Sequence, residues 1–336
     1  MILMDALSLQ KTKRRPVWIM RQAGRYLASF RKIRQKHGFL EVCDSAALSL
    51  EVSLLPIKQY ELDASIVFSD ILLPLRAHGL KVEFTDEGPL VYAPKSEAEL
   101  SKLRPSFDPH EGTPTILETL KLLRAEISKE KAVLGFAGAP FTLLVYLLEG
   151  KLSKDFSVVK KWMFEKPEIV HLWLDRLASS TGKYLEAQVD AGANAVQLFD
   201  TWASCLGQKS YEEFALPYAR KALSQVSAPS IYYVNGISGI LESAASVGAQ
   251  CLSIDWRMSL GEARKRTSQI TALQGNLDPH ELLLPKAELR QRVFRMLDSY
   301  GSGPGHIANL GHGIVPGIPE DAVKVFIDSV HEWGQK

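Results

Sequence analysis

The feature that most constrains the fold is a regular alternation of short apolar runs with longer amphipathic stretches. The apolar runs, most of them followed by a polar residue, are Val17–Met20, Ala64–Phe68, Ala132–Phe136, Ala195–Phe199, Ser230–Val234, Cys251–Ile254, Ile270–Leu273 and His306–Leu310. Helical spacing of apolar residues marks Leu48–Tyr60, Pro114–Lys129, Ile169–Ala191, Tyr211–Val226, Ser238–Val247 and Lys286–Tyr300. Strands that alternate with helices form a parallel sheet with right-handed crossovers. About eight such units favour a TIM-type (β/α)8 barrel of the α/β class.

The domain organisation follows from the same alternation. Residues 16–336 are expected to form one barrel domain, and residues 1–15 a solvated or disordered lead-in. Val17–Met20 has the weakest strand signal because it is short and close to the terminus. A doubly wound open sheet is the alternative architecture, but no glycine-rich dinucleotide turn follows any of the apolar runs.

One long stretch, Gly79–Thr115, does not fit the alternation because it is rich in proline and glycine. It predicts a small hairpin with Lys81–Phe84 and Leu90–Tyr92 as its arms. Long irregular insertions in barrels often serve as lids or binding loops, although a plain surface excursion fits the sequence equally well.

Charge is distributed unevenly along the chain. From Ala6 to Leu40 there are ten Lys or Arg residues and no Asp or Glu, while the formal net charge of the whole chain is only +2. The balanced total argues against a protein that coats nucleic acid, and the local basic segment indicates one anionic partner bound at one place. Three widely spaced cysteines fit a reducing compartment, and no apolar run approaches the roughly 20 residues of a membrane helix. We therefore expect a cytoplasmic protein with no membrane span and no nucleic-acid partner.

Three arginines are the first candidates for ligand binding. Arg21 and Arg25 are four residues apart and share one face of any helical turn, and Arg34 follows nine residues later. The planar guanidinium matches a carboxylate with two parallel hydrogen bonds, so three of them near a barrel mouth suit a ligand with several carboxylates or phosphates. On charge alone, a solvated basic face is the competing interpretation.

Acidic, histidine and tyrosine residues supply further candidates. Asp70 follows an apolar run and could accept N–H groups or stabilise a developing cation, or it could simply cap the turn that follows. Asp200 and Asp255 also follow apolar runs, and each could be either a functional acid or a cap of the next turn. His312 stands between two glycines, which suits either a ligand contact or a turn histidine bonded to backbone. Tyr146 lies in an apolar helical stretch where a buried core role is the simpler reading.

The missing motifs are also informative. The chain has no phosphate-binding GxxxxGK[ST] loop, no HExxH, CxxC or His-x-Cys pattern and no GxSxG elbow. A nucleotide site, a dedicated zinc site and a serine-hydrolase site are therefore not expected.

Five ordered sequence blocks resemble the uroporphyrinogen decarboxylase family. The first, at residues 16–25, reads PVWIMRQAGR, and the second, at residues 135–143, reads GFAGAPFTL. The blocks FSDIL (68–72), LQGNLDP (273–279) and ANLGHG (308–313) also match, so the resemblance covers nearly the whole chain.

This resemblance implies a cofactor-free and metal-free, single-domain distorted (β/α)8 barrel that forms a homodimer. The family removes carbon dioxide from the four acetate side chains of uroporphyrinogen III and forms coproporphyrinogen III, a haem precursor. By position, Asp70 and Arg21 match the catalytic residues of the family. The residues that match substrate contacts are Arg21, Arg25, Arg34, Asp70, Phe136, Tyr146, Thr201 and His312.

Two other functions stay open at this point. A zinc-dependent corrinoid methyltransferase of the same superfamily lacks its His-x-Cys ligands here, because the fifth apolar run is followed by Asn235 and Gly236. A non-catalytic polyanion binder would depend only on the basic segment and would show strongly salt-dependent affinity.

Overall fold

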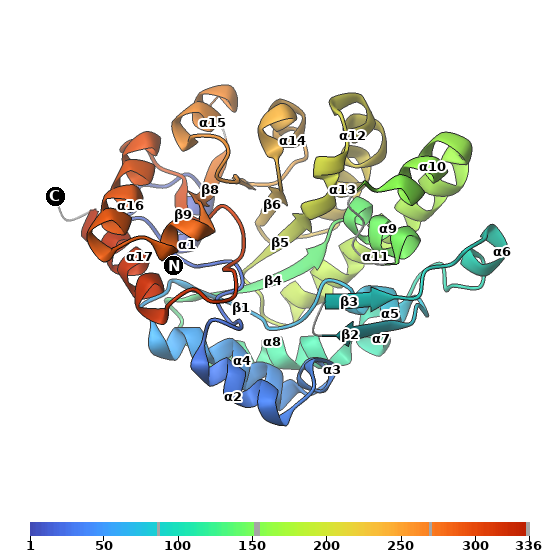
Figure 1. Cartoon of the computed structure of the whole chain (residues 1–336), viewed down its shortest axis with the longest axis horizontal. Helices are drawn as coiled ribbons and strands as arrows, with labels where there is room; N and C mark the ends of the chain where they lie inside the picture. Colours follow the sequence, from blue (N-terminus) through green and yellow to red (C-terminus); the bar gives the residue numbers. More distant parts are fainter. Residues whose placement is uncertain (86–87, 151–154, 269–270, 334–336) are drawn as a thin grey trace.

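The computed structural model describes residues 1–85, 88–150, 155–268 and 271–333. Its centre is a parallel sheet of seven strands that curls into an incomplete barrel with helices on the outside (Figure 1). The strands pair in the order β1 (Ala64–Ile66), β4 (Ala132–Gly138), β5 (Ala195–Asp200), β6 (Ser230–Val234), β7 (Cys251–Ser253), β8 (Ala272–Leu277) and β9 (His306–Leu310). The predicted distorted α/β barrel is therefore confirmed.

The outer helices of the barrel pack their apolar faces against the sheet and against one another. They are α4 (Ala46–Gln59), α8 (Pro114–Glu126), α11 (Pro167–Asp190), α13 (Leu216–Leu223), α14 (Leu241–Ala245), α15 (Leu260–Arg266), α16 (Lys286–Tyr300) and α17 (Glu320–Trp333). Shorter elements follow the strand ends, namely α5 (Leu73–Ala77), α9 (Pro140–Glu149), α10 (Ser157–Glu165), η1 (Thr201–Cys205), α12 (Gln208–Phe214), η2 (Ile237–Gly239) and η3 (Pro279–Leu283). Within the described ranges, none of the helices combines the length and apolar character needed to span a bilayer.

The prediction of a strand at Val17–Met20 is wrong, although this segment does occupy the eighth position of the barrel. Val17 makes only an isolated parallel bridge to Ala308, and its carbonyl accepts a hydrogen bond from the Asp63 N–H at 2.8 Å. Side chains replace part of the backbone hydrogen bonding that a regular strand would have. Asp63 Oδ2 accepts a hydrogen bond from the Val17 N–H, and Asn309 Oδ1 accepts one from the Met20 N–H. The segment thus closes the barrel between β9 and β1 without regular strand geometry.

Two other boundaries differ from the sequence prediction. Strand β8 begins at Ala272 and continues to Leu277, whereas Ile270 lies outside the described residues. Polar Gln274 belongs to this strand because its side chain bonds to Trp18, Gln197 and Ser253 inside the barrel. The expected helix at Tyr211–Val226 is interrupted before α13, whose first turn contains Pro217, a residue that cannot continue a helical ladder.

The first residues of the chain do not form the expected solvated or disordered lead-in. Helix α1 (Ile2–Leu7) buries Leu3, Ala6 and Leu7 in the cluster that fills the amino-terminal end of the barrel. Several strands begin there with a small residue, and these are Ala64, Ala132, Ala195, Cys251 and Ala272. Small side chains leave space for a helix to pack beneath the sheet, so α1 covers this end of the barrel.

The residues that link α1 to the barrel are also ordered by specific contacts. Arg14 forms a bidentate ion pair with Asp63 at 2.7 Å. Arg15 is buried, and its guanidinium donates to the carbonyls of Gly301 and Gly303. These two arginines therefore stabilise the amino-terminal connection, which is a structural role.

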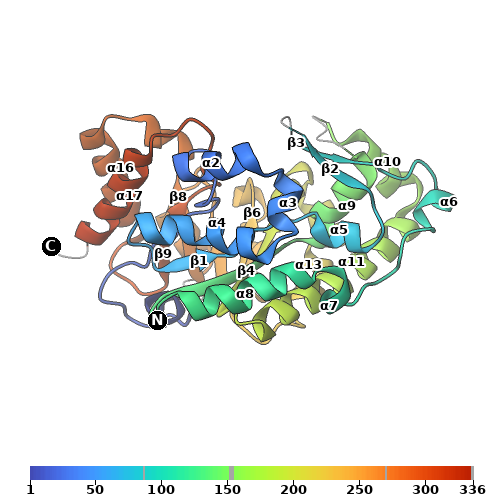
Figure 2. The same ribbon diagram turned by 90° about the horizontal axis from the view of Figure 1, so that it is seen from below.

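The predicted hairpin is present as β2 (Val82–Thr85) and β3 (Gly88–Val91), which pair antiparallel. The two short helices α6 (Glu97–Leu100) and α7 (Pro109–Gly112) complete this excursion. Figure 2 shows the hairpin on the same side of the barrel as α2 (Ala28–Lys36) and α3 (Phe39–Cys43), and the amino terminus on the opposite side. The hairpin thus lies on the side where the strands end.

Candidate active site

A cavity of about 480 Å³ opens where the barrel strands end. This is the end of the barrel at which enzymes of this fold carry their sites. The eight residues expected to contact a ligand all line it, namely Arg21, Arg25, Arg34, Asp70, Phe136, Tyr146, Thr201 and His312. They come from six separate parts of the chain, so tertiary structure alone brings them together.

Arg21 is held at the cavity by an unusual backbone. Its φ is +60°, in the left-handed region that residues other than glycine seldom adopt. Gly24 lies directly beneath this turn, where a Cβ would come within 3.0 Å of the Arg21 carbonyl oxygen. Strained backbone of this kind is common where a side chain must be placed for a ligand.

Asp70 lies in the turn after β1 and also lines the cavity. Its Oδ1 accepts a hydrogen bond from the Leu72 N–H at 2.8 Å, so it caps the turn after β1 while it lines the cavity. Burial raises the pKa of this carboxyl group to about 6, against the lowering effects of the Leu72 hydrogen bond and of Arg21. At neutral pH the group is therefore mainly ionised, and it is a strong acceptor in a surrounding of low polarity.

The other two aspartates have structural partners. Asp200 accepts hydrogen bonds from the hydroxyl groups of Thr142 and Tyr232, each at 2.8 Å, and burial raises its pKa to about 6. Asp255 accepts from the backbone N–H groups of Gly236 and Ile237. Neither aspartate lines the cavity.

His312 is an uncharged side chain at neutral pH. Burial, together with the positive charges of Arg21 and Arg257, lowers its pKa to about 4. Its Nδ1 accepts a hydrogen bond from the Gly313 N–H at 2.6 Å, which leaves the proton on Nε2. The ring packs edge-on against Tyr233 with 5.9 Å between ring centroids. The imidazole can therefore donate one hydrogen bond from Nε2.

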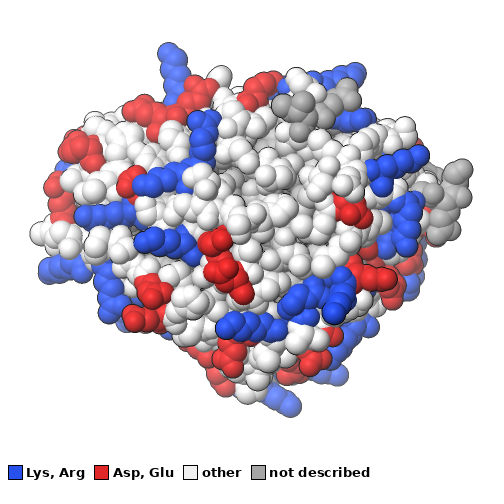
Figure 3. Space-filling model, turned by 180° about the vertical axis from the view of Figure 1, so that it is seen from behind, with Lys and Arg blue, Asp and Glu red and all other residues white. Residues whose placement is uncertain are grey.

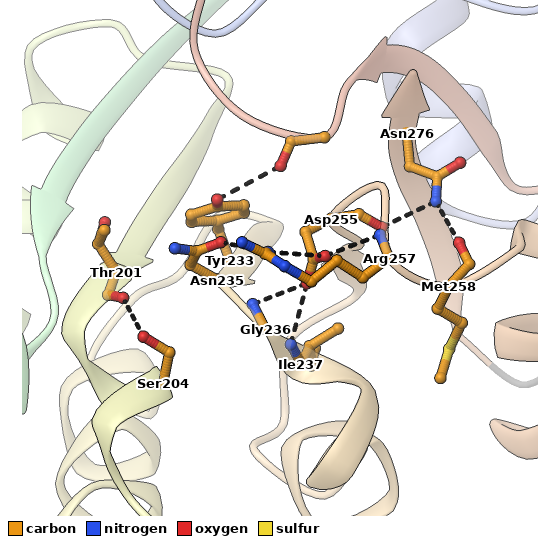
Figure 4. Close-up of polar contacts among 11 residues, drawn as sticks. Thr201, Ser204, Tyr233, Asn235, Gly236, Ile237, Asp255, Arg257, Met258 and Asn276 are labelled. Carbon is orange, nitrogen blue, oxygen red and sulfur yellow. Dashed lines mark hydrogen bonds and ion pairs between the residues drawn. The ribbon is translucent and has the colours of Figure 1, made fainter. Parts of the chain in front are cut away.

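Phe136, Tyr146 and Thr201 contribute the wall between β4 and β5. Phe136 packs edge-on against Phe199 with centroids 5.8 Å apart, and Tyr146 against Trp202 at 6.1 Å. Burial raises the pKa of Tyr146, so its hydroxyl stays protonated. The carbonyl of Thr201 accepts a hydrogen bond from the Ser204 hydroxyl at 3.2 Å (Figure 4).

The sequence did not indicate an aromatic wall on the other side of the cavity. Phe39 lies between Phe68 and Phe84, with ring centroids 5.8 and 4.6 Å away, and all three line the cavity. Arg34 packs over the Phe39 ring at 5.5 Å and donates from Nη1 to the His37 carbonyl at 2.5 Å. Phe68 belongs to the FSDIL block, but no motif marks Phe39 or Phe84, because the meeting of the three rings depends on the path of α3 and the hairpin.

The long excursion has a defined place at the site. Phe84 and Thr85 from β2 and Gly88 and Pro89 from β3 form part of the cavity lining. The hairpin is therefore a wall of the cavity and not a plain surface excursion.

Surface charge is mixed on the face of the molecule drawn in Figure 3. On this face (Figure 3), basic and acidic side chains are interspersed around the edge, and no continuous basic stripe crosses the described atoms. A continuous basic stripe is the electrostatic footprint of a nucleic-acid binder. This face offers no support for the polyanion-coating alternative.

The fold and the cavity together define the protein as a barrel enzyme with a small-molecule site at the strand ends. The model of the family described as "Uroporphyrinogen decarboxylase (URO-D)" matches residues 2–333. Curated proteins named uroporphyrinogen decarboxylase are 45% identical over 97% of both chains (Desulfotalea psychrophila) and 41% identical over 99% of this chain and 98% of the relative (Geobacter metallireducens). The chain belongs to the uroporphyrinogen decarboxylase family.

Solved structures support the fold. A methyltransferase from Methanosarcina mazei aligns with a TM-score of 0.82 over 98% of this chain and 97% of its own, at 19% sequence identity. At this identity the likeness shows a shared barrel architecture and nothing about the reaction.

Proposed function

We propose that this enzyme removes carbon dioxide from the four acetate side chains of uroporphyrinogen III and releases coproporphyrinogen III. The observation that carries the proposal is the meeting of the eight family-matched residues around one cavity in a chain of this family. Each acetate becomes a methyl group, and no cofactor or metal is part of the proposal.

The reaction needs a place for the electron pair of the breaking carbon–carbon bond. Protonation of a pyrrole ring carbon makes the ring a cation conjugated with the acetate. Loss of carbon dioxide then returns the electron pair to the ring, the exocyclic carbon takes a proton to become the methyl group, and the ring carbon loses its added proton. The enzyme has to supply the protons, stabilise the cation and hold the departing carboxylate.

Asp70 suits the stabilisation of that cation. The carboxylate lines the cavity, and only Oδ1 takes part in the turn with Leu72. A carboxylate in a partly desolvated site interacts more strongly with a positive ring than one in water. We propose that it accepts the pyrrole N–H groups and balances the charge of the protonated ring.

The arginines suit the carboxylates of the substrate. Arg21, Arg25 and Arg34 all line the cavity and offer planar pairs of donors. We propose Arg21 as a contact of the reacting acetate and as a candidate proton donor, although a guanidinium is a reluctant acid. Tyr146, Thr201 and the Nε2–H of His312 add neutral donors, and Phe136 supports the apolar body of the macrocycle.

Anaerobic incubation with uroporphyrinogen III, followed by oxidation and chromatography, tests the proposal. Products with seven to four carboxylates support it, and their absence overturns it. Stoichiometric zinc in the purified protein, with methyl transfer to a thiol, would favour the methyltransferase alternative. Among the described residues, no three His, Cys, Asp or Glu side chains are grouped closely enough to hold a metal ion.

We also propose that the enzyme is a cytoplasmic homodimer, as the family resemblance implies. Light scattering coupled to gel filtration measures the mass in solution against the 37.3 kDa of one chain. A mass of one chain at micromolar concentration would contradict the dimer.

A further inference from the structure

A polar cluster joins the ends of β6 and β7 beside the cavity (Figure 4). Asp255 is its buried centre and accepts hydrogen bonds from the N–H groups of Gly236 at 2.7 Å, Ile237 at 3.0 Å and Arg257 at 2.9 Å. Asn276 donates to the Asp255 carbonyl at 2.9 Å. The backbone that carries Arg257 is therefore fixed from three sides.

The side chain of Arg257 is oriented by three contacts. Nη1 donates to Asn235 Oδ1 at 2.9 Å and to Asp255 Oδ1 at 3.1 Å, and the guanidinium carbon lies 4.1 Å from the centroid of the Trp256 ring. The side chain still exposes 47% of its surface. Among the described residues no hydrogen-bond partner meets Nε or Nη2, so this oriented guanidinium has donors available for a ligand.

The cluster lies next to two residues of the cavity wall. Tyr233 donates from its hydroxyl to the Gly311 carbonyl, and a Cβ on Gly311 would come within 2.5 Å of the Trp256 nitrogen. His312 follows Gly311, and both Tyr233 and His312 line the cavity. Burial raises the pKa of Tyr233 and lowers that of His312, and the charge of Arg257 has a lowering effect on both, which places the guanidinium within electrostatic reach of the site.

The position complements the arginines already assigned. Arg21, Arg25 and Arg34 come from one short segment of the chain, whereas Arg257 stands at the ends of β6 and β7. A tetrapyrrole with eight carboxylates around its rim presents anionic groups in all directions. Three guanidiniums from one segment face only part of that rim.

We propose that Arg257 is a further substrate-binding residue, which holds a peripheral carboxylate of the macrocycle at the β6–β7 side of the mouth. Asp255, Asn235 and Trp256 position its guanidinium for this contact. The inference rests on the proposed function, since that function supplies the polycarboxylate.

Two substitutions separate the binding role from a structural one. Arg257→Gln keeps an N–H donor for Asp255 and removes the charge, whereas Arg257→Lys keeps the charge and removes the planar fork. Arg290→Ala is the matched control, because this exposed arginine of α16 pairs with Glu332. The readouts are kcat and KM with uroporphyrinogen III, the melting temperature, and the Kd for oxidised uroporphyrin from quenching of its fluorescence.

We expect Arg257→Gln to raise KM and the uroporphyrin Kd by about tenfold, which is about 1.4 kcal/mol of lost binding, and to change kcat by less than about twofold. Arg257→Lys should recover part of that loss, and Arg290→Ala should match the unsubstituted enzyme. Unchanged KM and Kd in Arg257→Gln would overturn the inference. A lower kcat together with a lower melting temperature, at an unchanged Kd, would overturn it too, because that combination indicates a purely structural role.

The same measurements distinguish this inference from the proposed function. If products form but the substitution leaves KM and Kd unchanged, the inference fails and the function stands. If uroporphyrin binding depends on Arg257 but no product forms, the function fails and the carboxylate contact stands. If the unsubstituted protein neither binds uroporphyrin nor forms product, both are wrong.

Discussion

Gly313 lies directly against the side chain of Arg21, although the two residues are at opposite ends of the chain. A Cβ on Gly313 would come within 2.4 Å of Arg21 Cδ and 2.6 Å of Cγ. The backbones are also tied, because the Ile314 N–H donates to the Met20 carbonyl at 3.1 Å. A glycine after His312 is therefore what allows Arg21 to reach the cavity.

Gly313→Ala should displace Arg21 and lower kcat/KM by at least about tenfold, since an added methyl group cannot share the space of the Arg21 methylenes. Steady-state kinetics measure the loss, and thermal denaturation checks the fold. Gly207→Ala is the control, because a Cβ there meets nothing within 4 Å. Wild-type kinetics in Gly313→Ala would show that Arg21 does not need its present position.

Asp70→Asn should leave the fold intact and lower kcat by at least about tenfold, equal to 1.4 kcal/mol of barrier. The asparagine oxygen can still accept the hydrogen bond from Leu72 that the turn requires. What is lost is the negative charge that we propose to balance the protonated pyrrole. Circular dichroism and kcat are the two measurements, and near-normal turnover would remove Asp70 from the mechanism.

The pH profile should show the ionisation of the same residue. Burial raises the Asp70 pKa to about 6, so the carboxylate becomes protonated as the pH falls through 6. Because the proposed role needs the ionised form, kcat/KM should decline below pH 6 and level off above it. The small residual activity of Asp70→Asn should lack this decline. A profile with the same acidic limb in both proteins would assign that limb to another group.

Arg25→Ala should raise KM more for the octacarboxylate uroporphyrinogen than for the pentacarboxylate intermediate. The pentacarboxylate has fewer carboxylates that Arg25 could contact, so its binding should depend less on this arginine. We expect a rise of about tenfold for the larger anion, in the range of a lost charge-assisted hydrogen bond. Arg220→Ala, which removes a guanidinium bonded to Ser246 on an outer helix, should leave both constants unchanged. Equal effects of Arg25→Ala on the two substrates would count against a carboxylate contact.

Leu3→Ala should destabilise the barrel from its amino-terminal end. The side chain is fully buried in the cluster beneath the strands, so its truncation should reduce the free energy of unfolding by about 2–5 kcal/mol. Leu122→Ala on α8 is the comparison, because that leucine is exposed. Equal denaturation midpoints for the two variants would mean that α1 contributes little to stability.

Much of the fold could be read from patterning, because a strand buried on both faces leaves a continuous apolar run. Seven of the eight expected runs contain or overlap strands, and the hairpin of the excursion is present. The predictions failed where side chains take over the role of the backbone, as Asp63 and Asn309 do around Val17 and Met20. They failed also at α1, whose burial depends on the small residues of strands far along the chain.

The candidate site, like the fold, could be predicted from sequence only in part. The resemblance in sequence singled out eight of the residues that line the cavity, with Asp70 after β1 among them. It did not indicate the phenylalanine wall or the exposed donors of Arg257, since neither forms a motif. Asp70 and Asp200 looked equivalent in sequence, and only the structure separates them. Asp70 lines the cavity, whereas Asp200 is buried and accepts hydrogen bonds from the hydroxyl groups of Thr142 and Tyr232.

The sequence by itself determined the α/β alternation, the family and the chemical types of the candidate groups, because these are properties of local residue order. Only the tertiary structure decided how those groups act. It brought Arg21 against Gly313, buried Asp70 enough to raise its pKa to about 6, and oriented the Arg257 guanidinium within electrostatic reach of His312. Distance, desolvation and orientation depend on contacts between residues that are far apart in the chain, and a linear pattern contains no measure of them.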